Sequence, residues 1–180
     1  MGIQLAAFFN CQPSLTSACC RTGFPLRSKP AENAGVNRKN MISEESKKRI
    51  LELWKAREPD ISYPPASEEQ IEDFEDVCRA IPEDYRWFLL NCGGGVIGSE
   101  WVDSIDELHS THTKFDEECA SENGWTIGNS FIIGWDGSGS PIAIDPDGKI
   151  IVEWEADSEV YQLAPSLEEW LLNGLVPSNG

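Results

Sequence analysis

Two short turns near the C-terminus limit most strongly what this chain can fold into. Asp136-Gly-Ser-Gly139 and Asp145-Pro-Asp-Gly148 have the Asp, Pro and Gly content of tight turns. Four short apolar runs with strand composition surround these turns: 131–135, 141–144, 150–155 and 160–163. Connections this short join antiparallel neighbours, because a parallel crossover needs about a dozen residues or more. The sequence therefore predicts an antiparallel sheet over residues 131–163.

Serine capping boxes mark three helix starts around this region. They pair Ser67 with Gln70, Ser104 with Glu107, and Ser166 with Glu169, and each precedes apolar residues at helical spacing. The apolar stripe expected behind the first box consists of Ile71, Phe74, Val77 and Cys78. Two further helices are predicted over residues 43–58 and 82–92, and glycines 93–95 are expected to end the second.

The order of these elements indicates the fold class. Helices come first, then strands, then a closing helix, which predicts a single α+β domain over residues 41–180. Within it, residues 96–101 are expected to form one short strand, and residues 116–130 are polar and irregular. Residues 1–40 lack sustained periodicity, so we predict that they are disordered or an upstream extension with Met41 as the natural initiator.

Charge is divided unevenly along the chain. Residues 1–40 carry five basic and one acidic side chain, a net charge of +4, whereas residues 41–180 carry 9 basic and 30 acidic side chains, a net charge of -21. So negative a field repels phosphate backbones and attracts cationic surfaces. We therefore expect no nucleic-acid binding by the folded domain. A basic protein partner would suit it, although acidity that only maintains solubility is the simpler interpretation of charge alone.

Cysteine usage and hydropathy bear on the compartment. The six cysteines form no CxxC pair, and Cys78 and Cys92 fall on apolar helix faces, which predicts reduced, intracellular thiols. No apolar run approaches the ~18 residues that a membrane span requires. The run from Ile3 to Phe9 is too short, and it lacks the positively charged lead of a secretory signal. We expect a cytoplasmic protein with no membrane association.

Several short motifs occur in a recognisable order over residues 67–172. They are Ile81-Pro-Glu-Asp-Tyr85, Phe88-Leu89 with Asn91 and glycines 93–95, Ile133-Gly134, Asp136-Gly-Ser-Gly139, Ile142-Ala-Ile-Asp145, Gly148, Val152 and Ala164-Pro-Ser-Leu-Glu-Glu-Trp-Leu171. Taken together, these motifs make the chain resemble the SUKH superfamily. That group joins bacterial polymorphic-toxin immunity proteins with the fungal regulator of cell-wall assembly. The usual pattern places the glycines straight after the Asn, whereas here Cys92 intervenes.

The resemblance implies a mainly antiparallel, twisted sheet packed against several helices. It also implies binding rather than catalysis, so we expect no enzyme activity and no cofactor. Most bacterial members are taken to neutralise a toxin, often a nuclease, by direct contact. The leading hypothesis is an immunity protein for a basic, nuclease-type toxin. The alternative is a regulatory or scaffolding adaptor similar to the fungal branch, with residues 1–40 as an interaction arm.

Acidic and aromatic residues near the predicted sheet form the candidate partner-binding site: Glu100, Trp101, Asp103, Asp106, Glu107, Trp135 and Asp136. Carboxylates can mimic the phosphates that a nuclease cleft holds, and aromatic side chains supply buried anchors at interfaces. Each residue also has an ordinary structural interpretation. Asp103, Asp106 and Glu107 suit a helix start, Asp136 suits a turn, and both tryptophans suit a core. The patch as a whole is therefore a stronger hypothesis than any one member.

Two patterns resemble metal sites, but neither is expected to hold a metal. The residues His109, His112, Asp116 and Cys119 fall along one helix side, as they would in an ordinary helix flank. The sequence Asp145-Pro-Asp-Gly148 resembles the start of a calcium loop, but the later ligands are missing. No motif ties either histidine to a Ser or Cys nucleophile. Glycines 93–95 follow a helix and precede no Lys, unlike those of a phosphate loop.

Overall fold

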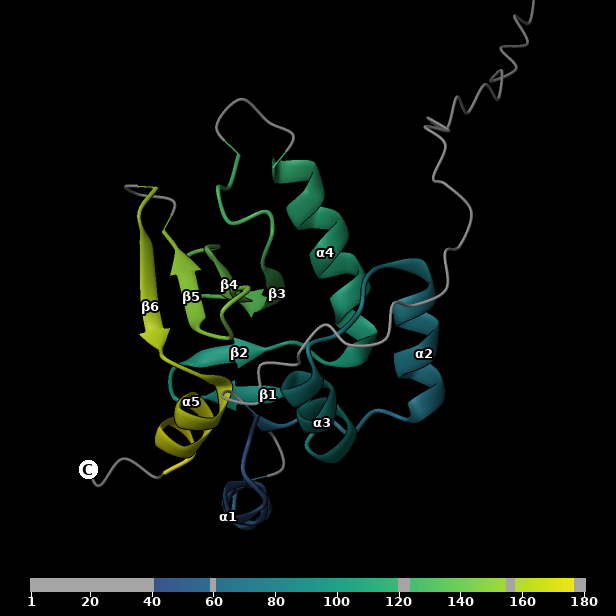
Figure 1. Ribbon diagram of the computed structural model, residues 1–180, viewed down its shortest axis with the longest axis vertical. Coiled ribbons are helices and arrows are strands. Elements are labelled where there is room, and N and C mark those ends of the chain that lie inside the picture. Colours follow the sequence, from purple (N-terminus) through teal and green to yellow (C-terminus); the bar gives the residue numbers. More distant parts are fainter. Residues whose placement is uncertain (1–40, 59–60, 120–123, 155–157, 177–180) are drawn as a thin grey trace, which may run out of the picture. The chain divides into compact units, whose positions relative to one another are not determined.

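The computed structural model describes residues 41–58, 61–119, 124–154 and 158–176, all within the unit Asn37–Gly180 (Figure 1). Its helices are α1 (Glu44–Lys55), α2 (Glu68–Val77), α3 (Glu83–Asn91), α4 (Ile105–Cys119) and α5 (Leu167–Gly174). Its strands are β1 (Gly95–Ile97), β2 (Glu100–Val102), β3 (Phe131–Trp135), β4 (Pro141–Ile144), β5 (Ile150–Glu153) and β6 (Val160–Ala164). The predicted α+β class is confirmed. The prediction for residues 1–40 lies outside the described residues.

Four strands form one antiparallel sheet in the order β3-β4-β5-β6, and β1 and β2 form a two-stranded hairpin. The predicted turns at Asp136 and Asp145 join β3 to β4 and β4 to β5. The hairpin adjoins the larger sheet, because the Asp103 backbone N–H donates to the Ile133 carbonyl at 2.9 Å. A Cβ on Gly134 would lie 2.4 Å from the Trp101 carbonyl oxygen, so only glycine permits this close approach of β2 and β3.

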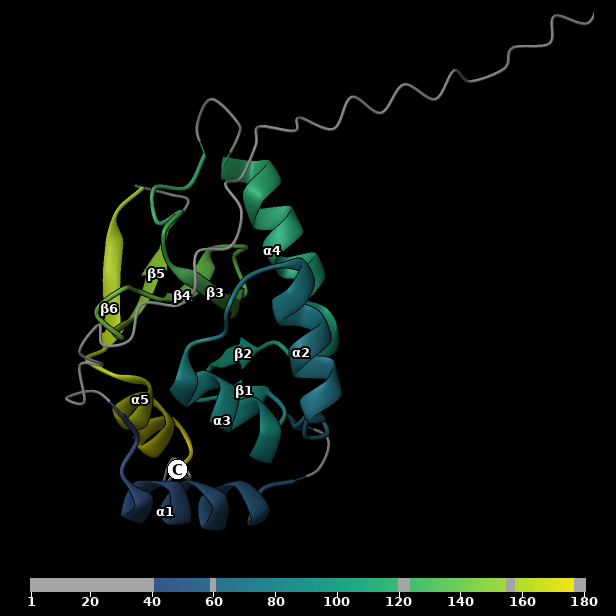
Figure 2. The same cartoon turned by 45° about the vertical axis from the view of Figure 1, so that its right-hand side comes forward.

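Both faces of β3, β4 and β5 are buried, which explains why these three strands are apolar runs rather than alternating sequences, whereas β6 is largely exposed. One face contributes Ile142, Ile144, Ile150 and Val152 to the main core, which also contains residues of α2, α3 and α5. The other face contributes Ile132, Ala143 and Ile151 to a smaller core around Phe115 of α4. Helix α5 packs against β1 and β6, and α1 packs against α5 (Figure 2). Within the described ranges, every helix is too short or too polar to cross a bilayer.

The three serine boxes begin helices α2, α4 and α5 as predicted. The Ser67 hydroxyl oxygen accepts from the Gln70 N–H at 3.1 Å, and the Gln70 side chain accepts from the Ser67 N–H at 2.9 Å. The Ser104 N–H donates to the Glu107 carboxylate at 3.2 Å. The Glu169 N–H donates to the Ser166 hydroxyl oxygen at 3.2 Å. These bonds satisfy N–H groups that a helix terminus would otherwise leave unpaired.

Glycines 93–95 follow the end of α3, as predicted, and they also admit a second segment of chain. All three have positive φ values. A Cβ on Gly93 would lie 2.1 Å from the Pro64 carbonyl oxygen, and the Tyr63 N–H donates to the Gly94 carbonyl at 2.9 Å. The segment 61–64 therefore packs directly on the glycines. This contact was not part of the sequence prediction.

Three predictions about individual elements are wrong. Residues 96–101 are not one strand, because Ile97 pairs with Glu100 across a two-residue turn. Residues 116–119 are not irregular, because α4 continues to Cys119, which packs against the smaller core. Val77 does not belong to the apolar stripe of α2 and is 71% exposed. At 3.6 residues per turn, it falls to one side of the line through Ile71, Phe74 and Cys78.

Candidate functional site

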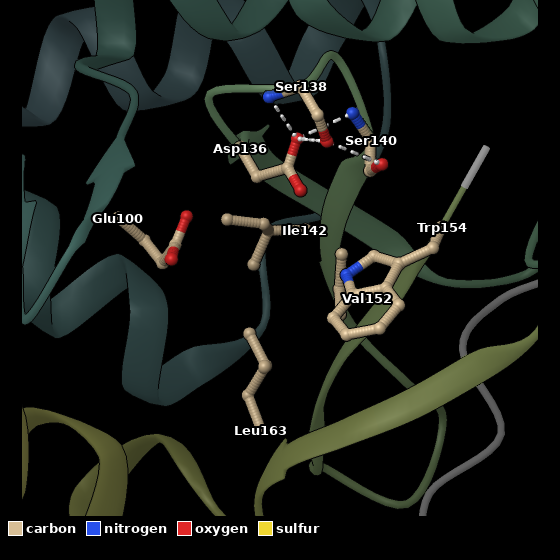
Figure 3. Close-up of a pocket in the computed structure, with 8 residues that line it drawn as sticks. All are labelled: Glu100, Asp136, Ser138, Ser140, Ile142, Val152, Trp154 and Leu163. Atoms are coloured by element: carbon tan, nitrogen blue, oxygen red, sulfur yellow. Dashed lines mark hydrogen bonds between the residues drawn. The ribbon is translucent and has the colours of Figure 1, made fainter. Parts of the chain in front are cut away.

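A groove opens over β4–β6 beside the start of β2, and Figure 3 shows the residues that line it. We call it the sheet groove, and its volume is about 610 Å³. Its lining combines carboxylates, hydroxyls and apolar side chains: Glu100, Asp136, Ser138, Ser140, Ile142, Val152, Trp154 and Leu163. Such a mixture of apolar surface with a few polar groups is typical of binding sites.

The floor of the sheet groove belongs to the main core. Ile142 of β4 and Val152 of β5 are paired neighbours, with 0% and 2% of their surface exposed. Trp154 and Leu163 are instead 43% and 40% exposed, although both are large and apolar. The groove therefore has a rigid floor and exposed apolar sides. The two exposed side chains offer apolar area that a partner could remove from water.

Trp154 is held in place by a second aromatic ring. Its indole lies 4.3 Å from the ring of Tyr161, centroid to centroid, with 35° between the planes. The backbone of Trp154 is also hydrogen-bonded, since its N–H donates to the Glu159 carbonyl and its carbonyl accepts from the Ser158 N–H. An aromatic side chain ordered in this way loses little conformational entropy when a partner binds to it.

Asp136 lies at the end of β3 and shapes the turn beside the groove. One of its carboxylate oxygens, Oδ1, accepts from the Ser138 N–H and the Ser140 N–H, both at 2.8 Å, and from the Ser138 hydroxyl at 2.7 Å. The other oxygen accepts no hydrogen bond from the residues that the structure describes, and it points into the groove in Figure 3. Partial burial alone would raise the pKa of Asp136, but hydrogen bonds from Ser140, Ser138 and Gly139 outweigh it and lower the pKa. Asp136 is therefore ionised at neutral pH.

Glu100 reaches the same groove from the first residue of β2. Its Oε1 accepts from the Ser99 hydroxyl at 2.7 Å. In Figure 3 it lies across the groove from Trp154, with Ile142 between them. Within the described part of the chain, neither Glu100 nor Asp136 forms an ion pair with a basic side chain. The groove thus combines uncompensated negative charge with exposed apolar surface.

Comparison with protein families places the chain. Residues 65–173 match the model of the SMI1 / KNR4 family (SUKH-1). This chain belongs to the SMI1 / KNR4 family. Members of this SUKH group bind partner proteins in general. None of the curated proteins compared with this SUKH chain matches it.

The SUKH domain brings only two of the seven predicted site residues, Glu100 and Asp136, into the groove. Trp101 follows Glu100 on β2, so it points to the opposite face. It is 46% exposed and lies 5.9 Å from Tyr63, ring to ring. Trp135 is half-buried beneath the Lys114 ammonium, which lies 3.6 Å from its ring centroid. The two tryptophans therefore line other surfaces.

The remaining three predicted residues anchor the start of α4. Asp103 accepts from the Thr111 hydroxyl, and burial raises the pKa of Asp103 to about 6. Asp106 accepts from the Gln70 side chain at 2.9 Å, and Glu107 accepts from the Tyr63 hydroxyl at 3.3 Å. These bonds tie α4 to α2 and to segment 61–64. Asp103, Asp106 and Glu107 thus have the structural role at a helix start that was the alternative interpretation of their sequence positions.

The apolar half of the groove was missed by sequence reasoning. Ile142, Val152 and Leu163 come from three strands and Trp154 directly follows β5, and each falls in a predicted apolar run. An apolar run in the sequence indicates a strand, but it does not indicate which of its side chains other elements cover and which stay exposed. The one available signal was Trp154, a large aromatic at the end of a strand next to a polar connection.

The possible metal ligands on α4 point in different directions. His109 is exposed, whereas His112 is buried with its ring 4.7 Å from that of Phe131. Burial lowers the pKa of His112 to about 4, and nearby Arg79 adds to this effect. Asp116 instead pairs with Arg79 at 3.2 Å. Among the described residues, no three His, Cys, Asp or Glu side chains are grouped so as to hold a metal ion.

Proposed function

We propose that this SUKH domain is a non-catalytic immunity protein that binds a cognate toxin in the cytoplasm and blocks its active cleft. The observation that carries the proposal is the sheet groove, where Glu100 and Asp136 face exposed Trp154 and Leu163. Aromatic and apolar anchors surrounded by charge are typical of protein-binding surfaces. Family membership supports protein binding in general.

Charge favours a basic, nuclease-type toxin as the partner. Residues 41–180 carry a net charge of -21. A nuclease cleft is positive where it holds phosphate, so an acidic surface accelerates the encounter and competes with the substrate. Glu100 and Asp136 would then stand in for two phosphate groups. The same field argues against direct binding of nucleic acid by this domain.

Co-expression with a toxin domain encoded beside this gene tests the proposal. We expect the full chain to relieve killing by the toxin and to be recovered with it in a pull-down. Trp154→Ala should weaken the complex, because it removes the largest exposed apolar side chain of the groove. Val77→Ala is a suitable control, since Val77 is exposed on α2 and does not line the groove. Unrelieved killing with no recovered complex would contradict the proposal.

A regulatory or scaffolding adaptor is the second candidate. It is favoured by the net charge of +4 on residues 1–40, which contrasts with the acidic domain. Deletion of residues 1–40 separates the two functions. An adaptor that uses this basic segment should lose its partner, whereas an immunity protein that uses the sheet groove should keep its toxin.

A further inference from the structure

We infer that the sheet groove receives one arginine side chain of the partner, flanked by an apolar side chain. The inference rests on the proposed function only in that the partner is a protein. It specifies the chemistry that the groove recognises. A groove of about 610 Å³ falls within the ~300–1,000 Å³ range of ligand pockets, so it has room for a few side chains.

The carboxylates of Glu100 and Asp136 favour a positively charged side chain in the groove. Glu100 and Asp136 reach the groove from β2 and from the turn after β3, and no described basic side chain pairs with either. The three hydrogen bonds to Asp136 Oδ1 hold its carboxylate in place and leave the other oxygen facing the groove (Figure 3). A cationic side chain would find its counter-charges already oriented, which lowers the cost of binding.

The aromatic side of the groove favours arginine over lysine. Guanidinium is planar, presents five N–H donors in a fixed fork, and stacks on aromatic rings. Trp154 lies across the groove from Glu100 (Figure 3). The ring of Tyr161 packs on this indole, with 4.3 Å between the ring centroids. An arginine could therefore stack on the indole while its donors reach the carboxylates. A compact ammonium makes the charge contact but not the planar one.

Leu163 specifies the neighbour of this arginine. It is 40% exposed, belongs to β6 and lines the groove beyond Ile142 (Figure 3). The β5-β6 register shifts at this point, and Leu163 has no partner residue on β5 in the ladder. Irregularities of this kind redirect side chains. An apolar side chain next to the arginine would cover Leu163 and remove both groups from water.

Peptide titration of the full chain tests the inference. The probe is acetyl-Leu-Arg-Leu-amide, and the matched peptides replace Arg with Lys or with citrulline, which keeps the shape and loses the charge. Binding is followed by the NMR signal of the Trp154 indole N–H. We expect saturable shifts with the Arg peptide and about tenfold weaker binding of the citrulline peptide, since charge-assisted hydrogen bonds are lost. The Lys peptide should fall between them.

Three variants locate the site. Glu100→Gln and Asp136→Asn should each weaken the Arg peptide about tenfold, because both remove charge at nearly constant shape. Asparagine retains an Oδ1 acceptor for Ser138 and Ser140, so the turn is preserved. Asp145→Asn is the matched control, because Asp145 accepts the same turn bonds but does not line the groove. It should leave binding within about twofold of the wild type.

Equal affinity for the Arg and citrulline peptides would overturn the inference. So would unchanged binding in the Glu100→Gln variant, or no saturable shift at about 20 mM peptide, which is roughly twenty times the ~1 mM dissociation constant of a weak complex. These outcomes are separable from failure of the proposed function. If the toxin is captured regardless of Glu100→Gln, the inference falls and the immunity function stands. If the Arg peptide binds at Trp154 and no toxin is captured, the inference stands and the immunity function falls.

Discussion

The turns at Asp136 and Asp145 are nearly identical in hydrogen bonding, yet only one borders the groove. In each, the aspartate Oδ1 accepts from the N–H groups two and four residues later, at 2.8–2.9 Å. In each, the aspartate N–H donates to the carbonyl of the residue four positions on, at 2.9 Å. Both turns contain a glycine at positive φ, Gly139 and Gly148. The local sequence chemistry is therefore the same.

The surroundings separate the two turns. The Asp136 turn follows β3, which lies against β2, and this neighbour places Glu100 beside it. The Asp145 turn instead contains a basic residue, Lys149, which forms an ion pair with Asp147 at 3.2 Å. Asp136 thus faces the carboxylate of Glu100 and exposed apolar surface, whereas Asp145 lies beside the ion pair of Asp147 with Lys149. The hydrogen bonds of the aspartate stabilise both turns, whereas tertiary packing determines which of the two aspartates lies at the sheet groove.

The largest expected effect comes from breaking the packing that brings the Asp136 turn to β2. In Gly134→Ala the new Cβ would lie 2.4 Å from the Trp101 carbonyl, so β2 must move away from β3. We expect a loss of about 3 kcal/mol or more in unfolding free energy, in the range of severe core changes. Chemical denaturation measures it. Gly137→Ala, in the turn itself, has open space around the added Cβ and should change stability by less than about 0.5 kcal/mol.

A pH series distinguishes Asp136 from another predicted site residue, Asp103. Burial raises the pKa of Asp103 from 3.8 to about 6. As pH rises from about 4 to 6, the unfolded state loses this proton first, so the wild type loses stability over that window. Asp103→Asn removes this loss. Its stability relative to the wild type should increase by about 2 kcal/mol between pH 4 and 6 and then level off.

Asp136 should show the opposite sign in the same experiment. Its pKa is lowered in the folded state, so its contribution is present at neutral pH and is lost as pH falls below about 4. If the difference in unfolding free energy between Asp103→Asn and the wild type does not change with pH, the prediction for Asp103 is contradicted. A matched scan of Asp136→Asn should instead converge with the wild type at the acid end.

Removing the turn carboxylates tests whether the two turns are structurally equivalent. Asp136→Ala and Asp145→Ala each remove an acceptor that serves two backbone N–H groups. We expect each to lose about 1–2 kcal/mol of unfolding free energy, as for lost helix caps and similar local bonds. Thermal or chemical denaturation measures both losses. Partner binding should fall only for Asp136→Ala, and equal losses of binding would show that the groove is not the site.

A small effect on stability is expected from substitutions of exposed apolar residues. Leu163→Ser and Val77→Ser alter side chains that are 40% and 71% exposed, so each should change the unfolding free energy by less than about 1 kcal/mol. Only Leu163 lines the sheet groove. Calorimetric titration with the partner should therefore detect weaker binding for Leu163→Ser and no change for Val77→Ser.

Much of the fold follows from local chemistry, which a sequence displays directly. The Asp136 and Asp145 turns predicted the hairpins, and Ser67, Ser104 and Ser166 predicted helix starts, because each signal acts within about four residues. The hairpin at Gly98 was missed because its strands are only three residues long. Val77 was misplaced because it lies at the edge of a helical stripe.

The candidate site depended on contacts that a sequence does not display. Glu100 and Asp136 were predicted from their charge, but so were Asp103, Asp106 and Glu107, which hold α4 in place. What separates these two sets is burial and hydrogen bonding between distant segments, such as Tyr63 with Glu107 at 3.3 Å. The exposure of Trp154 depends likewise on how far the helices extend over the sheet. Composition sets the charge of the domain, but packing determines where that charge is available.

The division of the groove into a buried floor and an exposed rim has an evolutionary consequence. Ile142 and Val152 belong to the core, so their substitution would unfold the domain along with the groove. The rim residues Glu100, Trp154 and Leu163 are partly exposed and can change at little cost to folding. Partner choice could therefore drift through a handful of rim positions while the scaffold stays constant. A domain built this way can change what it binds without changing its fold.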